Sequence, residues 1–111
     1  MIAEATFDTQ LNRVFGALAD PIRRSILDQL ARGSATVGEL VAQHQVTGGA
    51  ITKHLKVLES AGLLVREKDA QWRRCHARVE GLTEARRWIE DRQAFWNEQF
   101  DQLEGYLQSS D

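Results

Sequence analysis

Cysteine and proline each occur once in the 111 residues of the chain, and long apolar runs are absent. A single cysteine, Cys75, excludes an internal disulfide and a zinc site built on paired cysteines. No stretch approaches the ~20 consecutive apolar residues of a membrane span, so we expect no membrane partner. The N-terminal residues contain neither a basic segment nor an apolar run, and so do not resemble a secretory signal. These absences predict a cytoplasmic protein in which residues 1–111 form a single domain.

The charge is nearly balanced overall, with a formal net charge of −2, but it is unevenly distributed along the chain. Residues 46–79 carry seven basic and three acidic side chains, whereas residues 80–111 carry three basic and eight acidic ones. A polyanion responds to the local field of a surface rather than to the sum over the chain. The middle third of the chain is therefore a candidate for binding nucleic acid.

The first part of the chain predicts two helices. Apolar residues at helical spacing indicate a first helix over about residues 6–18. The proline follows Asp20, and this pair is typical of a helix start, because Asp20 can cap free N–H groups and Pro21 suits the first helical position. Gly33 then ends the second helix.

Two further helices, joined by a tight turn, are predicted next. Thr36 and Glu39 fit a capping box at the start of a short third helix. Thr47 can cap the fourth helix, which Gly62 ends. Two short helices in this arrangement predict a helix-turn-helix over about residues 36–60.

A β-hairpin, the wing, is predicted directly afterwards, over about residues 63–79. In its second strand, Arg74 and His76 fall on one face, whereas Arg73 and Cys75 fall on the other. The hairpin carries a cluster of cations, namely Arg66, Lys68, Arg73 and Arg74.

The fourth helix carries the residues that point to DNA. Its apolar side, made of Ile51, Leu55 and Leu58, must face the core. The opposite side carries a glycine, a hydroxyl and two ammonium groups, namely Gly49, Thr52, Lys53 and Lys56. Lysine can donate to guanine or phosphate, and threonine can contact a base edge or a thymine methyl. An ordinary solvated helix face is the alternative, but the cationic wing, placed where it would touch phosphates or the minor groove, favours double-stranded DNA as the partner.

A long last helix is predicted over about residues 82–107, with Thr83 as its cap. Five of the eight aromatic residues lie between Trp88 and Tyr106, and one helix cannot bury so wide a stripe against a small core. We expect this helix and the first one to pack against their copies in a homodimer. The expected interface residues are Phe7, Leu11, Trp88, Trp96, Phe100, Leu103 and Leu107. Packing within one chain, or a pocket for an apolar small-molecule effector, are the alternatives.

The predicted fold is mainly α with a small β-hairpin, in the order α-α-α-α-β-β-α, dimerising through its first and last helices. In such a dimer the two fourth helices would enter successive major grooves ~34–36 Å apart. An inverted repeat is the DNA sequence that fits this two-fold symmetry.

Three segments of the chain resemble the ArsR-type family of winged-helix transcriptional repressors. They are Leu18-Ala-Asp-Pro-Ile-Arg-Arg-Ser-Ile-Leu27, Val37-Gly-Glu-Leu40 and Ile51-Thr-Lys-His-Leu-Lys-Val-Leu-Glu-Ser-Ala-Gly-Leu-Leu64. Residues 71–75 and the tail from Phe95 to Leu107 are similar to a metal-independent branch of that family. The resemblance implies a winged helix-turn-helix and a homodimeric bacterial repressor. It also implies a recognition-helix site made of Thr47, Gly48, Gly49, Thr52, Lys53, His54 and Lys56.

The ArsR family is best known for sensing metals, but this sequence offers no matching set of ligands. The helix before the turn contains no thiol, and no histidine follows His76. The carboxylates of the last helix, among them Glu90, Asp91 and Glu98, are typical of a solvated face. Zinc needs about four N, S or O ligands, so we expect neither a metal nor another cofactor.

Two residues leave alternatives open. Cys75 shares a strand face with Ala77, which favours a small buried residue, and a redox-responsive thiol aided by Arg73 or Arg74 is the alternative. His54 lies beside the apolar stripe of the fourth helix, where it either packs half-buried or contacts DNA.

The sequence therefore predicts a sequence-specific DNA-binding transcriptional repressor and no enzyme. No Ser/His/Asp or Cys/His grouping is supported by adjacent elements, and the turn around Thr47 lacks the lysine of a phosphate-binding loop. A winged-helix module that binds a partner protein through its aromatic last helix is the alternative from another class.

Overall fold

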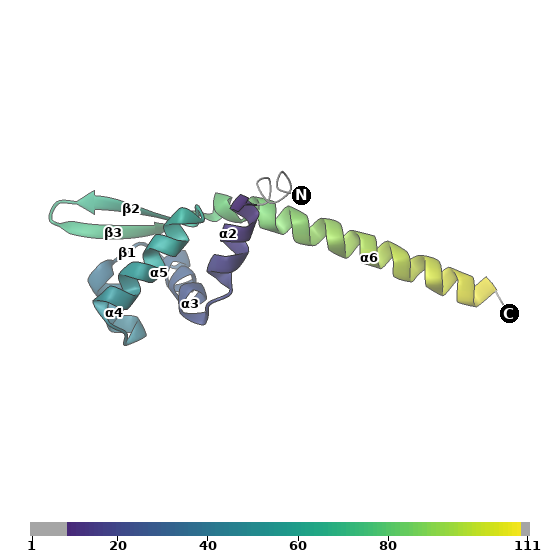
Figure 1. The fold of residues 1–111 in the computed structure, drawn as a ribbon, viewed down its shortest axis with the longest axis horizontal. Coiled ribbons are helices and arrows are strands. Elements are labelled where there is room, and N and C mark those ends of the chain that lie inside the picture. Colours follow the sequence, from purple (N-terminus) through teal and green to yellow (C-terminus); the bar gives the residue numbers. More distant parts are fainter. Residues whose placement is uncertain (1–8, 110–111) are drawn as a thin grey trace.

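A helical body, a β-hairpin and one long helix make up the fold (Figure 1). The computed structural model describes residues 9–109. In chain order the elements are α2 (Thr9–Leu18), α3 (Pro21–Ala31), β1 (Ala35–Thr36), α4 (Val37–His44), α5 (Gly48–Ser60), β2 (Leu64–Asp69), β3 (Trp72–Ala77), the 3-10 helix η1 (Val79–Leu82) and α6 (Thr83–Ser109). The hairpin and α6 extend to opposite ends of the longest dimension, which measures 71 Å (Figure 1). The predicted class, mainly α with a small hairpin, is confirmed.

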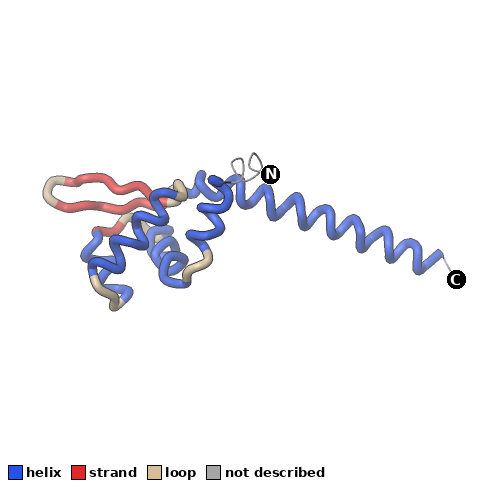
Figure 2. The backbone as a smooth tube through the Cα atoms, in the orientation of Figure 1, coloured by secondary structure: helices blue, strands red, loops and turns tan. Residues whose placement is uncertain are grey.

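The sheet contains three antiparallel strands in the order β1-β3-β2 (Figure 2). Strand β1 is absent from the sequence prediction, because two residues are too few to show an alternating pattern. It pairs with β3, with Ala35 opposite Cys75 and Thr36 opposite Arg74. Since α4 begins directly after β1, this short pairing fixes the start of the helix-turn-helix to the wing.

Side-chain caps start the helices where the sequence predicts them. Asp20 accepts hydrogen bonds from the backbone N–H groups of Ile22 at 2.9 Å and of Arg23 at 3.0 Å. Thr36 and Glu39 form the predicted capping box, each side chain accepting from the other's backbone N–H. These contacts satisfy N–H groups that a helix start otherwise leaves unpaired. The predicted caps of α3 and α4 are confirmed.

The core lies where α2, α3, α4 and α5 meet the sheet. Its largest fully buried side chains are Val14, Ile26, Leu40, Ile51, Leu55, Leu58, Leu63, Leu64 and Cys75. The predicted core side of α5, made of Ile51, Leu55 and Leu58, is 0% exposed and is thus confirmed. Because these anchors hold α5 from one side, its other side faces solvent.

The hairpin closes through a two-residue loop, Ala70-Gln71, between the paired residues Asp69 and Trp72. Ala70 has a φ of 55°, in the left-handed region that costs a residue with a Cβ about 1–2 kcal/mol. The tip of the wing therefore holds local backbone strain.

The structure corrects two expectations about the C-terminal part and leaves one residue undescribed. Strand β3 ends at Ala77, and Val79, predicted to belong to it, lies in η1 and is 68% exposed. Thr83 has helical angles, φ −60° and ψ −46°, so it is the first residue of α6 rather than its cap. The proposed interface residue Phe7 lies outside the described residues.

Candidate nucleic-acid interface

Helix α5 presents a polar face on the side away from the core. Lys53 and Lys56 are exposed, and within residues 9–109 neither makes a hydrogen bond or an ion pair. Thr52 is half-buried, and its hydroxyl donates to the carbonyl oxygen of Gly48 at 2.9 Å. The threonine oxygen can still accept a hydrogen bond from a base edge, and its methyl group can contact thymine.

The start of α5 lies open to solvent. Thr47 caps the helix by accepting the backbone N–H of Ala50 at 3.1 Å. The next two residues, Gly48 and Gly49, are exposed, and a Cβ added at Gly48 would meet nothing within 4 Å. A first turn without side chains lets another backbone approach closely, and the positive end of a helix dipole favours an anion such as phosphate.

His54 belongs to α5 but is held by the helix start of α3. Its side chain is 18% exposed, and its Nδ1 lies 3.3 Å from Nη1 of Arg23 and 3.9 Å from a carboxylate oxygen of Asp20. Arg23 also donates to the carbonyl oxygens of Ala17 at 2.8 Å and Gly16 at 3.0 Å. This network favours packing for His54, which the sequence left open against a DNA contact.

The pleat of the hairpin separates the cations of the wing. Lys68 lies directly opposite Arg73, and both fall on the sheet face that carries the buried Cys75. Arg74 falls on the other face, opposite Glu67, and donates to Ser34 at 3.2 Å. The sequence predicts this split for Arg73 and Arg74 of the second strand. Arg66, opposite Cys75, shares the face of Lys68 and Arg73, so three cations lie on the side of the helical body.

Arg66 of the wing forms an ion pair with a residue of α5. Its guanidinium pairs with Glu59 of α5, with Nη2 3.0 Å from Oε1, and its side chain is only 17% exposed. This ion pair ties α5 to the first strand of the wing. Sequence reasoning placed Arg66 among the DNA contacts and missed this pair, since alternation along a strand gives a residue's face but not its partner. The only hint in the sequence is that the opposite charges flank the turn at Gly62.

Cys75 lies beneath that ion pair and is fully buried. Burial raises the pKa of its thiol, and Glu59 adds to the increase, whereas Arg66 opposes it. The thiolate is the reactive form of cysteine, so a buried thiol with a raised pKa is a poor redox centre. These observations favour the small buried residue over the redox-responsive alternative.

The described residues offer no clustered metal ligands. Across residues 9–109, no three His, Cys, Asp or Glu side chains gather in a way that could hold a metal ion. Both ring nitrogens of His44 are occupied, Nδ1 by the carbonyl oxygen of Leu40 at 2.9 Å and Nε2 by Ser25 at 3.0 Å. On the outer face of the wing, Nε2 of His76 lies 3.5 Å from Oε2 of Glu67. The donor set of residues 9–109 thus does not fit a zinc site.

Helix α6 leaves the body after its first turns. Ala85 is buried, and Trp88 packs edge-on against Phe15 of α2 with their ring centroids 5.7 Å apart. Farther along, the large apolar residues are more than half exposed, namely Phe95, Trp96, Phe100, Leu103, Tyr106 and Leu107. Leu11, on α2, is partly buried against the core. No helix within residues 9–109 is both long and apolar enough to cross a membrane.

Comparison with protein families gives a match over residues 20–65 to the family described as bacterial regulatory protein, arsR family. The matched residues run from the cap of α3 through α5 into β2. The transcriptional repressor SdpR of Bacillus subtilis (strain 168) is 34% identical over 62 residues, which cover 56% of this chain and 69% of SdpR.

Two solved structures have the same fold. The crystal structure of the ArsR family transcriptional regulator RHA00566 has a TM-score of 0.75 and 37% identity, and the match covers 80% of this chain and 92% of that one. The solution structure of the homodimeric winged helix-turn-helix DNA-binding domain Mb0332 from Mycobacterium bovis has a TM-score of 0.66 and 24% identity, covering 78% and 81% of the two chains. Both likenesses include the helix-turn-helix architecture.

Proposed function

The chain belongs to the ArsR family of bacterial regulatory proteins, and we propose that it is a homodimeric transcriptional repressor that binds an inverted-repeat operator. Transcriptional regulators of this family are not enzymes. One observation supports the proposal most: α5 buries its apolar side completely, while Lys53 and Lys56 stand exposed and unpaired within residues 9–109 on its other side. A helix anchored in this way can enter a major groove and present its polar side to base edges.

The proposed contacts divide between α5 and the wing. The front of α5 would read bases and bind nearby phosphates through Thr47, Gly48, Gly49, Thr52, Lys53 and Lys56. Lys68 and Arg73 would bind backbone phosphates or the adjacent minor groove, because they share the sheet face on the side of the helices. Arg74 would reach DNA only from the outer face. His54 and Arg66, which are held by Arg23 and Glu59, would position α5 and the wing rather than touch DNA.

A second copy of the chain is the proposed cover for α6. Trp96 and Phe100 are 58% and 62% exposed, and burying such side chains is worth roughly 1.5–3 kcal/mol each. The interface would extend from Leu11 and Trp88 to Leu103 and Leu107. Mb0332, which has the same fold, is homodimeric, and this supports a dimeric state.

Repression, independence from metals and a cytoplasmic location complete the proposal. The relative SdpR is a transcriptional repressor. The donor set, with Cys75 buried and both nitrogens of His44 occupied, supports membership of a metal-independent branch. Zinc or a chelator should thus leave DNA affinity unchanged. A regulator of bacterial genes acts on DNA in the cytoplasm.

The proposed function is tested by titrating the protein against duplex DNA from its own promoter region. Replacing Lys53 or Lys56 by Ala should weaken binding by about 1–3 kcal/mol where the side chain makes a bidentate base contact. Arg87→Ala is the matched control, because Arg87 is an exposed cation on α6. Affinity that is unchanged in both lysine variants would refute the assignment of α5.

A further inference from the structure

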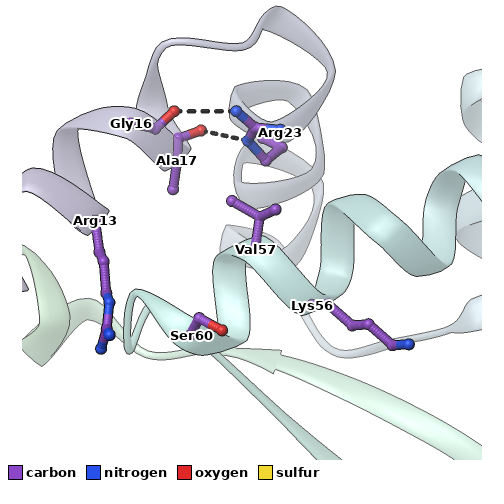
Figure 3. A pocket seen from close by; sticks show the side chains of 7 residues that line it. All are labelled: Arg13, Gly16, Ala17, Arg23, Lys56, Val57 and Ser60. Carbon is purple, nitrogen blue, oxygen red and sulfur yellow. Dashed lines mark hydrogen bonds between the residues drawn. The ribbon is translucent and has the colours of Figure 1, made fainter.

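Helices α2, α3 and α5 enclose a shallow groove of about 370 Å³ beside the front of α5 (Figure 3). Three basic side chains line it, one from each helix, and the described lining contains no acidic residue. The lining residues are Arg13, Gly16, Ala17, Arg23, Lys56, Val57 and Ser60. The surface of the groove is mostly apolar, and basic side chains from three helices border it; one of them, Lys56, also belongs to the proposed DNA-binding face.

The three cations differ in whether they already have a hydrogen-bond or ion-pair partner. Arg23 is committed, because its guanidinium donates to the carbonyl oxygens of Gly16 and Ala17, as the dashed lines in Figure 3 show. Arg13 is exposed and, within residues 9–109, has no hydrogen-bond or ion-pair partner, and the same holds for Lys56. Figure 3 shows Arg13 and Lys56 on either side of Ser60. Two uncommitted cations and a hydroxyl donor thus border the open side of the groove.

The position of Arg13 on α2 keeps it away from the proposed dimer interface. At about 100° per residue, Arg13 lies about 160° around the helix from Leu11, which faces the interface side. Phe15, which touches Trp88 of α6, lies on the Leu11 side. A second subunit covering α2 and α6 would therefore leave Arg13 open to solvent.

We propose that this groove binds a phosphate of the DNA backbone at the edge of the major groove that α5 enters, with Arg13 as the contact that α2 contributes. The inference rests on the proposed function and adds a third element, besides α5 and the wing, to the DNA-binding surface. Lys56 links the two surfaces, because it belongs both to the front of α5 and to the wall of the groove. Backbone contacts of this kind fix the orientation of a protein on DNA without reading its sequence.

The test measures affinity for a random-sequence duplex and for a promoter duplex as the salt concentration rises. Each neutralised phosphate contributes about 0.9 to the slope of log affinity against log salt, so Arg13→Gln should lower the slope by about 1.8 in a dimer with two grooves. The ratio of wild-type to variant affinity should then fall about twelvefold between roughly 50 and 200 mM salt. The loss should be equal for both duplexes, and the melting temperature should not change, because Arg13 is exposed.

Two matched variants sharpen the result. Arg13→Lys keeps the positive charge and should keep the wild-type slope, while Arg87→Gln on α6 removes the same charge outside the groove and should also keep it. A wild-type slope in Arg13→Gln, alongside weakened binding in the Lys53 variant, would overturn the groove site and leave the proposed function standing. Inorganic phosphate binding to the free protein at the same affinity as DNA, and lost in Arg13→Gln, would overturn it in favour of a small-anion site. Wild-type protein that binds neither duplex would overturn the proposed function itself.

Discussion

Nδ1 of His54 lies 3.3 Å from Nη1 of Arg23, which joins the middle of α5 to the start of α3. Arginine carries only donors, so Nδ1 must accept this hydrogen bond and the ring proton sits on Nε2. The same guanidinium holds the last carbonyl groups of α2. One arginine therefore connects three helices, and the orientation of α5 depends on the cap that starts α3.

That cap gives the fold an acid-sensitive contact. The backbone N–H of Arg23 is the main cause that lowers the pKa of Asp20; burial opposes it, whereas the charge of Arg23 and the N–H of Ile22 add to it. A carboxyl with a lowered pKa stabilises the fold above its ordinary value near 3.8, and this contribution is lost as the pH falls through the lowered value. Asp20→Asn should therefore show a shallower loss of stability with acid, measured by urea unfolding at stepped pH.

Asparagine is also a good helix cap, so this variant should stay folded at neutral pH. Asp28→Asn, which removes an exposed carboxylate from the same helix, is the matched control. The idea fails if Asp20→Asn and Asp28→Asn have the same acid profile.

Gly81 in η1 packs directly on the backbone of Gly62, in the turn between α5 and β2. A Cβ at this position would lie 2.2 Å from the carbonyl oxygen of Gly62, a backbone atom that cannot move aside cheaply. Gly81→Ala should destabilise the protein by about 3 kcal/mol, as overpacking does. Thermal unfolding measures the effect. Gly105→Ala, where the added Cβ meets nothing within 4 Å, should instead be neutral or gain up to about 1 kcal/mol. Equal melting temperatures for the two variants would contradict the close approach.

The strained tip of the wing predicts a stabilising substitution. Ala70→Gly removes the Cβ that disfavours a φ of 55°, which outweighs the flexibility that glycine adds to the unfolded chain. We expect a gain of about 0.5–1 kcal/mol in the free energy of unfolding. Ala42→Gly in the exposed part of α4 is the control and should lose about 1 kcal/mol. A similar loss at Ala70 would show that the left-handed backbone carries no strain.

The exposed stripe of α6 predicts how the proposed dimer fails. Trp96→Glu or Leu103→Glu would bury a charge in the interface, so either should shift the protein to monomer in sedimentation equilibrium. Ala94→Glu, on the opposite side of the helix, should leave the dimer intact. Dimers that persist in both stripe variants would exclude α6 as the interface.

Much of the fold could be predicted from patterns among residues that are close in the sequence. Caps such as Thr36 with Glu39, and the apolar side of α5, depend on residues a few positions apart, so spacing alone predicts them. The pairs that sequence reasoning missed join different helices or strands: Arg23 with His54, Glu59 with Arg66, and β1 with β3. The groove was missed for the same reason, because its three basic residues come from three helices that only the tertiary fold brings together.

Most of α6 packs against no other part of the described chain, so the activity of the proposed repressor should depend on its concentration in the cell. In the proposed dimer, a second copy of the chain would supply part of the free energy that keeps α6 helical, so the apparent stability would rise with protein concentration. At a low number of copies per cell, monomers with a frayed α6 would occupy single half-sites. At a high number of copies, dimers would occupy both half-sites of an operator. The protein concentration needed for repression would then depend on the apolar dimer interface of α6, a helix that does not itself contact DNA.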